Sequence, residues 1–273
     1  MKLSTIITAL VVSMFSTTLW AVVRFPVLPT TAVFSVSPTQ KVTFSPGNLQ
    51  YQPSTKTWRF APEQTSMIGE SNTNISATYT GWVDLFGWST DNPLTPSGVS
   101  NSKNTSDYHG SFVDWGGNQI ENFAPNTWRT LSYDEWNYLI RNRGYNTYSL
   151  ACVAGVNGLI LFPDNWQCPE GITLSYGYGG KVDPITYSLS QTLSDDQWYA
   201  LEAAGAIFLP ANGYRSGVEV DALRLCGCYW SSTPSTRYQN DAYMFSFEPS
   251  SVGMSNNVYR HFGRSVRLVR NVD

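Results

Sequence analysis

The sequence has few charged side chains for its 273 residues, and neither sign dominates. Charged residues make up 14% of the chain, and the formal net charge at pH 7 is −3. A protein that binds nucleic acid or an anionic membrane carries a marked basic surplus. We therefore predict neither a nucleic-acid partner nor an anionic membrane partner.

Histidine and cysteine are also scarce, which argues against a metal centre. The chain has two histidines, His109 and His261, and four cysteines. A structural zinc site needs four such ligands in one place, and a calcium site needs a dense set of oxygen ligands. Neither pattern occurs in the sequence, so we predict no metal and no cofactor.

Motifs for common enzyme chemistries are missing as well. The sequence contains no G-x-S-x-G, no P-loop and no G-x-G-x-x-G after a strand. A glycosidase needs only two facing carboxylates, but Asp195 and Asp196 are better explained as acids of a first helical turn, where the helix dipole favours them. We predict a protein without catalytic residues.

Long apolar runs are absent apart from one short run at the N-terminus. Lys2 precedes an apolar stretch over residues 6–15, and Ala21 is a small residue where a signal peptidase cuts. The stretch is too short to span a bilayer and has the pattern of a secretory signal peptide. We expect residues 1–21 to be that peptide, with a buried N-terminal strand as the alternative. The protein is thus expected to be exported to the periplasm, the cell surface or the medium, with no transmembrane span.

The cysteines lie beyond this segment, so an oxidising compartment would permit disulfides. The four are Cys152, Cys168, Cys226 and Cys228. Four cysteines allow three pairings, and the sequence does not choose among them. A bridge between Cys226 and Cys228 would be strained, because they are only two residues apart.

Aromatic residues, in contrast, are abundant, and arginine gathers towards the C-terminus. The chain has ten Trp, sixteen Tyr and thirteen Phe, and seven of its twelve Arg lie after residue 210, where no Lys occurs. Arg forks onto carboxylates and stacks on rings. This end of the chain is therefore expected to make specific contacts.

Two segments have the pattern of amphipathic helices, TLSYDEWNYLIRNRG (130–144) and TLSDDQWYALEAAG (192–205). Both end at a glycine suited to a left-handed C-cap, and their apolar residues fall at helical spacing. Each begins with a capping box: Ser132 with Glu135, and Ser194 with Gln197. The likeness is either a true internal repeat or the convergent use of the same capping chemistry.

The rest of the chain reads as strands and loops within one domain over residues 22–273. No linker or charge block divides it, and its length suits one domain. Residues 62–127 have no long periodic segment and are predicted to be a loop-rich insertion anchored by rings such as Trp82, Trp88 and Trp115. Short apolar or alternating runs predict strands at residues 32–37, 41–45, 48–52, 57–61, 156–166 and 205–215. The fold class is predicted to be α+β.

Several blocks resemble a known fold. WRTLSYDEWNYLIRNRG (128–144) resembles the Arg-Leu-Pro-Thr-x-x-Glu-Trp signature of formylglycine-generating-enzyme (sulfatase-modifying factor) domains, a branch of the C-type lectin-like fold, although its Pro is replaced. VTFSPGNLQYQPSTKTWRFA (42–61), GCYWSSTP (227–234) and GRSVRLVR (263–270) resemble, in the same order, blocks of exported proteins of gut anaerobes built on that fold. The resemblance implies two helices, antiparallel sheets and much irregular loop.

The resemblance also implies that the first and last strands pair antiparallel and close the domain. GRSVRLVR (263–270) would be the last strand, beside a strand from residues 32–45. Val266 and Leu268 would then face the core, as a period of two requires. We interpret its arginines as edge charges that discourage aggregation: Arg264, Arg267 and Arg270.

The activity of the namesake enzyme does not carry over to this chain. That enzyme uses a copper-binding pair of cysteines late in the domain, whereas the only late pair here, Cys226-Gly227-Cys228, is spaced more tightly and lies outside the expected segment. A calcium-dependent lectin is not indicated either, because Glu248-Pro249-Ser250 has only the start of a sugar-binding motif.

The C-terminal segment 229–270 has the composition of an adaptable binding surface. Tyr gives rigid contact area, and Ser and Asn give flexible hydrogen bonding. We predict one ligand-binding face made of Ser232, Arg237, Tyr238, Asn240, Tyr243, Asn256, Asn257, Tyr259, Arg260 and His261. Alternation in the segment would place Tyr243, Phe245 and Phe247 on one side of a strand.

This layout is similar to the variable region of diversity-generating-retroelement target proteins, in which a C-terminal lectin-fold segment is mutated and displayed. The predicted function is a non-catalytic adhesin or receptor for a protein or glycan on another cell or on a phage or host surface. An enzyme of the formylglycine-generating type and a structural subunit of a surface fibre are the alternatives.

Overall fold

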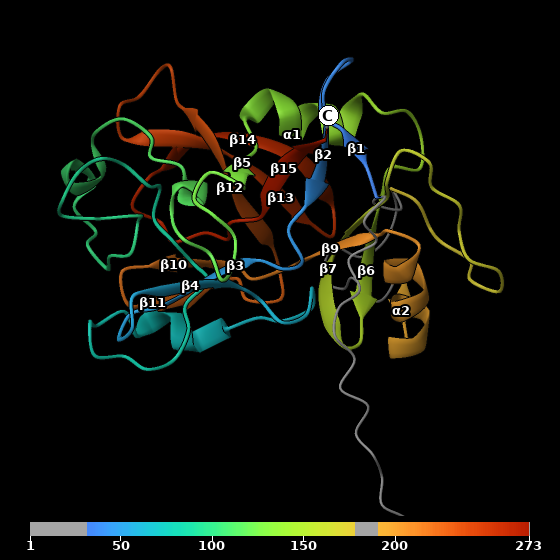
Figure 1. Ribbon diagram of the computed structural model, residues 1–273, viewed down its shortest axis with the longest axis horizontal. Helices are drawn as coiled ribbons and strands as arrows, with labels where there is room; N and C mark the ends of the chain where they lie inside the picture. Colours follow the sequence, from blue (N-terminus) through green and yellow to red (C-terminus); the bar gives the residue numbers. More distant parts are fainter. Residues whose placement is uncertain (1–31, 178–190, 273) are drawn as a thin grey trace, which may run out of the picture.

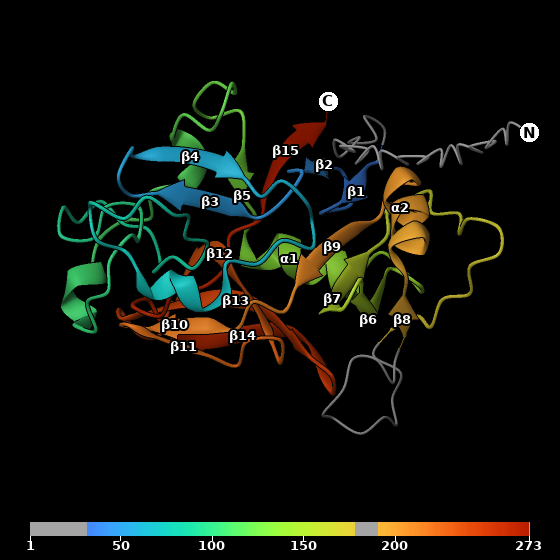
Figure 2. The ribbon, with the colours of Figure 1, turned by 90° about the horizontal axis from the view of Figure 1, so that it is seen from below.

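The computed structural model describes residues 32–177 and 191–272, which form an α+β fold. The described residues contain two α-helices and five small sheets (Figure 1). The predicted signal peptide, residues 1–21, lies outside the described residues. In both ribbon views, β6 (Tyr148–Val153), β7 (Val156–Leu161) and β9 (Ile207–Pro210) lie with α2 (Asp195–Ala203) at one end of the molecule (Figure 2). The hairpin of β10 (Tyr214–Ser216) and β11 (Glu219–Asp221) lies toward the other end.

The two ends of the described chain meet in one four-stranded sheet. It runs in the order β1 (Phe34–Ser35), β2 (Lys41–Phe44), β15 (Leu268–Val272) and β5 (Arg129–Thr130). Strand β15 pairs antiparallel with β2 through Val269 opposite Phe44. The predicted antiparallel pairing of the last strand with residues 32–45 is confirmed.

Both predicted helices form, and both capping boxes are present. In α1 (Tyr133–Arg141) the Ser132 hydroxyl accepts a hydrogen bond from the Glu135 amide, and the Glu135 carboxylate accepts one from the Ser132 amide. The same reciprocal pair occurs at the start of α2 (Asp195–Ala203). Satisfying two otherwise unpaired N–H groups fixes where each helix begins.

The helices cover opposite faces of a second sheet, of order β8 (Thr192–Leu193), β6 (Tyr148–Val153), β7 (Val156–Leu161), β9 (Ile207–Pro210). One face shares a core cluster with α1, and the other packs with α2. Strand β6 was not predicted from the sequence. Its small residues, Ser149 and Ala151, are fully buried. Because they are not strongly apolar, the segment lacks the apolar pattern by which a buried strand is predicted.

The C-terminal segment forms a three-stranded antiparallel sheet of β12 (Gly227–Pro234), β13 (Asp241–Glu248) and β14 (Ser251–Tyr259). Helix α1 packs against it, with the Trp136 ring stacked on Phe245 at 4.8 Å between centroids. The predicted alternation is confirmed, because Phe245 and Phe247 share the α1 cluster and Met244 lies in the other one.

Irregular structure and short hairpins make up the remainder. Strands β3 (Leu49–Gln52) and β4 (Thr57–Phe60) pair, as do β10 (Tyr214–Ser216) and β11 (Glu219–Asp221). Residues 62–127 contain isolated β-bridges and the 3₁₀ turns η1 (Gly69–Thr73), η2 (Thr105–Tyr108) and η3 (Trp115–Gly117), but no longer element. Of the three rings predicted to anchor this segment, Trp88 and Trp115 are fully buried and Trp82 is half-buried.

The interpretation of the last arginines as edge charges is wrong for two of the three. Arg264 and Arg267 are buried, and only Arg270 is exposed. The reason is topological: β15 lies between β2 and β5, and the residues before it form bridges to three other segments. At Arg264 and Arg267 there is therefore no open sheet edge for a charge to protect.

The buried arginines instead supply hydrogen-bond donors to irregular backbone. Arg215, which has no exposed surface, donates to the carbonyls of Leu85 and Ser100 in the insertion. Arg267 donates to Gln64 Oε1 at 2.6 Å and to the Phe208 carbonyl. Loops leave carbonyl groups unpaired, and each must find a donor when it is buried. The C-terminal arginines therefore fasten the insertion to the core.

Candidate functional site

Four predicted site residues gather where β12, β13 and β14 meet the turn at residues 235–240, and we call them the terminal cluster: Arg237, Tyr238, Asn240 and Tyr259. Tyr259 lies opposite Asp241, whose amide donates to the Tyr238 carbonyl. The Arg237 guanidinium lies 5.1 Å from the centre of the Tyr238 ring.

The tyrosines of the terminal cluster are well exposed, although tyrosine usually keeps much of its ring covered. Tyr238 has 45% of its surface exposed and Tyr259 has 51%. The turn is held by local bonds, because the Ser235 hydroxyl accepts from the amides of Arg237 and Tyr238. His109 of the insertion hydrogen-bonds to Asn240. The cluster is therefore an ordered rim with two exposed rings.

Arg260 does not belong to this exposed rim, contrary to the prediction. It is 5% exposed and lies 4.2 Å from the centre of the Trp88 ring. Its guanidinium donates to the carbonyls of Tyr108, Gly110 and Asp241. These three carbonyl groups occupy the donors of the guanidinium inside the protein. Arg260 therefore ties the insertion to β14 rather than facing a ligand.

His261 is also buried rather than exposed, with 9% of its surface accessible. Its ring stacks on Tyr259 at 5.4 Å and packs on Phe262 at 4.6 Å. Burial lowers the pKa of His261, and the nearby Arg264 adds to this effect. His261 therefore supports the Tyr259 ring from beneath.

The other predicted residues lie elsewhere on the sheet. Ser232 and Tyr243 are half-buried beside the start of α1: the Ser232 amide donates to the Leu131 carbonyl, and the Tyr243 ring lies 4.6 Å from that of Tyr133. Asn256 and Asn257 lie in β14, and their side chains are outside the described part of the structure.

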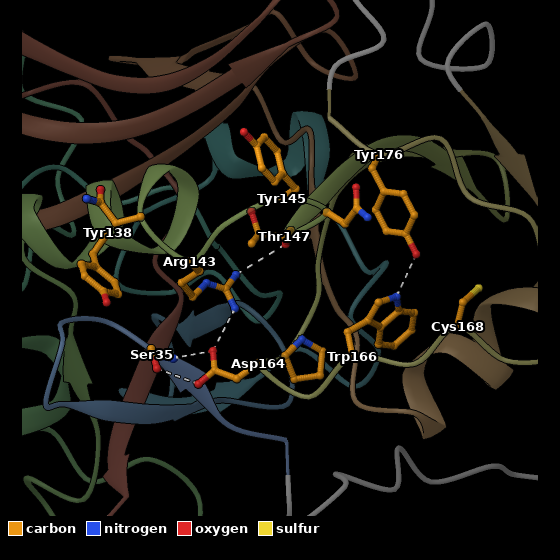
Figure 3. A pocket seen from close by; sticks show the side chains of 12 residues that line it. Ser35, Tyr138, Arg143, Tyr145, Thr147, Asp164, Trp166, Cys168 and Tyr176 are labelled. Carbon is orange, nitrogen blue, oxygen red and sulfur yellow. Dashed lines mark hydrogen bonds and ion pairs between the residues drawn. The ribbon is translucent and has the colours of Figure 1, made fainter.

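A second candidate site, missed by the sequence analysis, is a cleft of about 590 Å³ at the end of α1 (Figure 3). Its walls come from three parts of the chain: the end of α1 and the following turn, β1, and the segment after β7. It is lined by aromatic and polar side chains, among them Tyr138, Asn142, Tyr145, Asn146, Trp166 and Tyr176.

The charged residues of the cleft are already paired. Arg143 Nη1 lies 3.5 Å from Asp164 Oδ1, and the Arg143 guanidinium also donates to the Phe162 and Thr147 carbonyls. Burial lowers the pKa of Arg143 to about 10, so it stays a cation at neutral pH. Burial alone would raise the pKa of Asp164, but hydrogen bonds from Ser35 and the charge of Arg143 hold it below its usual value.

Aromatic rings and free amides remain for a ligand. Tyr145 is 99% exposed on the turn after α1, and the Trp166 indole donates to the Tyr176 hydroxyl, which orients both rings (Figure 3). The volume suits a small ligand. A ligand with apolar faces and neutral hydroxyl groups fits this lining better than an anion, because the one cation is used up internally.

Within the described residues, no three His, Cys, Asp or Glu side chains gather as a metal site. None of the helices in the described ranges is long and apolar enough to cross a membrane.

Comparison with known proteins gives a partial match. Residues 184–269 match the model of a family described as a domain of unknown function (DUF8237). The matched stretch includes α2 and the three-stranded C-terminal sheet, and therefore the terminal cluster. No curated protein and no solved structure matches the chain.

Proposed function

We propose that the protein is an exported, non-catalytic ligand-binding protein, of the adhesin or receptor type, with a C-type lectin-like scaffold. The antiparallel pairing of β2 with β15, the two capped helices and the long irregular insertion support this scaffold. The ligand is a protein or glycan on another cell or on a phage or host surface.

The observation that carries the proposal is the exposure of Tyr238 and Tyr259 on an ordered rim. Exposed tyrosines flanked by Arg and Asn are typical of hot spots in binding surfaces. The rim rests on a buried frame, since His261 packs beneath Tyr259 and Arg260 anchors the strand end. A rigid support lowers the entropy lost on binding. A protein ligand is the partner that this exposed, polar-aromatic rim favours.

A glycan ligand is the second candidate, and the cleft at the end of α1 favours it. Aromatic rings offer apolar faces for the C–H groups of a sugar, and amides such as that of Asn142 offer hydrogen bonds to its hydroxyls. The two candidates use different residues, so mutations separate them.

The test selects binders from two probes, a phage-displayed random-peptide library and an array of neutral and acidic oligosaccharides. We expect enriched peptides to lose binding to Tyr238→Ala/Tyr259→Ala while binding Tyr145→Ala/Trp166→Ala normally. Oligosaccharides that bind should show the reverse pattern. Each double variant serves as the matched control of the other. Binding that both variants retain in full, or no binder from either probe, would falsify the proposal.

The segment 229–270 is also proposed to be a target of retroelement diversification, given its Asn-, Ser- and Tyr-rich composition. A reverse-transcriptase gene beside this one, with an imperfect second copy of the codons for these residues, is the expected observation. A gene neighbourhood with neither element contradicts diversification and leaves the binding proposal as it is.

A further inference from the structure

Two cysteine side chains meet at the start of β12. Cys226 lies one residue before the strand and Cys228 is its second residue, and their sulfur atoms are 3.5 Å apart. The backbone fixes this approach, because the Cys226 amide donates to the Ala222 carbonyl while Cys228 pairs with Ser246 of β13. Cys226 is partly exposed and Cys228 is 3% exposed. Cys226 is thus the more accessible of the two residues, and Cys228 is buried.

A buried cation faces the inner thiol. Arg264 is 5% exposed and lies among the rings of Trp230, Phe262 and Tyr214, with its guanidinium carbon 5.2, 5.5 and 5.6 Å from their centres. Within the described chain no carboxylate forms an ion pair with it, and its buried Nε has no hydrogen-bond partner. A buried charge requires a counter-charge or strong hydrogen bonds. The groups that act on its charge are the Cys228 and Cys226 sulfurs, with a hydrogen bond to Cys228, and the Tyr214 hydroxyl.

The two thiols differ in how readily they lose a proton. A hydrogen bond from Cys226 lowers the pKa of the Cys228 thiol, against the effect of burial and with the help of Arg264. The same hydrogen bond, together with burial, raises the pKa of Cys226. Glu248, at the far end of β13, is the nearby acid and acts against both ionisations. A thiolate at Cys228 gives Arg264 the counter-charge that it otherwise lacks.

We propose that Cys226 and Cys228 are a reversible dithiol–disulfide site whose reaction partner is a low-molecular-weight disulfide. Cys226 passes its proton to Cys228 and attacks the external disulfide, which forms a mixed disulfide and releases one thiolate. The released thiolate takes this proton from Cys228. The Cys228 sulfur then attacks the Cys226 sulfur and releases the second thiolate. The protein loses two electrons and one bridge forms, while the external disulfide gains two electrons and its bridge breaks.

Arg264 makes the reduced state the favoured one. Forming the bridge removes the thiolate and leaves the buried guanidinium without its counter-charge, which disfavours oxidation. A bridge across two residues is also strained and easily reduced. The site therefore exchanges with its partner in both directions rather than acting as a permanent structural link.

The first experiment uses the wild-type protein and mixtures of glutathione and glutathione disulfide, followed by alkylation and tryptic digestion. Cleavage after Arg224 and Arg237 gives one peptide, residues 225–237, that holds Cys226, Cys228 and no other cysteine. We expect this peptide to lose two hydrogens as the disulfide share rises and to regain them when glutathione is restored. The peptide 144–181, with Cys152 and Cys168, is the internal control and should not lose two hydrogens. Alkylation of both thiols in peptide 225–237 under every mixture would overturn the proposal.

The second experiment tests the role of Arg264 as a positioning residue. In Arg264→Met the glutathione disulfide share at half-oxidation should fall severalfold, because the reduced state loses its ion pair, and the pH profile of alkylation of peptide 225–237 should move to higher pH. Arg264→Lys keeps the positive charge and is the conservative variant, so both readouts should stay nearer the wild type. Cys228→Ser should stop at a mixed disulfide on Cys226. An unchanged half-oxidation point and an unchanged pH profile in folded Arg264→Met would contradict the proposed role of this side chain.

Discussion

The turn between β12 and β13 and the segment 260–267 both contain arginine and serine beside an aromatic residue, but their arginines lie in opposite environments. In the turn, Arg237 and Tyr238 are exposed, whereas Arg260, Arg264 and Arg267 in the second segment are all buried. From composition alone, both segments were predicted to belong to one exposed binding surface. The difference shows that an Arg-rich, polar segment can be buried in a protein whose loops need hydrogen-bond donors.

The physical reason lies in the 62–127 insertion. Without regular strands or α-helices, its buried carbonyls have few partners of their own, and the arginine fork supplies several donors from one side chain. Arg260 reaches Tyr108 and Gly110, Arg267 reaches Gln64, and Arg215 reaches Ser100. An arginine outside the segment also donates to a carbonyl of the insertion, so this use of arginine is not confined to one part of the molecule.

The strongest way to test this contrast is Arg267→Ala, which should lower the free energy of unfolding by about 3 kcal/mol. The change empties a fully buried position and removes the donors to Gln64 Oε1 and the Phe208 carbonyl. Arg270→Ala, three residues on, in β15, and exposed, is the matched control at about 0.5 kcal/mol or less. Urea denaturation followed by tryptophan fluorescence measures both. Equal losses in the two variants would mean that burial of Arg267 contributes nothing.

A smaller but local effect is expected for Arg260→Ala, about 2 kcal/mol. Loss of the guanidinium frees the carbonyls of Tyr108 and Gly110 and uncovers Trp88, so the insertion should loosen where it meets β14. Hydrogen exchange of amides in residues 105–112 should accelerate more than that of the β6–β7 hairpin. Arg237→Ala is the control and should leave both rates unchanged. Uniform acceleration over the whole chain would argue against a local clamp.

Local features of the fold were predictable, and features that depend on distant residues were not. The capping boxes at Ser132 and Ser194 lie within four residues, so the sequence reveals both helix starts. The pairing of β15 with β2 followed from a resemblance, because no local pattern selects a partner more than 200 residues away. Strand β6 was missed, since Ser149 and Ala151 are small enough to be buried without an apolar signal.

The candidate sites divide in the same way. Tyr238 and Tyr259 were predicted from composition, and their exposure agrees with that interpretation. The burial of Arg260 and His261 depends on Trp88 and Phe262, which no local pattern connects to them. The cleft combines the turn after α1 with residues after β7, and Tyr145 is the one signal in it: an aromatic residue in the polar run Asn142 to Asn146.

The smallest change in the free energy of unfolding is expected for the exposed tyrosines of the terminal cluster. Tyr238→Ala/Tyr259→Ala should change the free energy of unfolding by about 0.5 kcal/mol per residue or less, because half of each ring is already in water. The stacking of Tyr259 on His261 sets this upper value. Urea denaturation beside Arg260→Ala, under identical conditions, makes the comparison direct. A loss in the tyrosine variant as large as that in Arg260→Ala would place both rings in the frame, and the terminal cluster and the segment 260–267 would then differ in position but not in role.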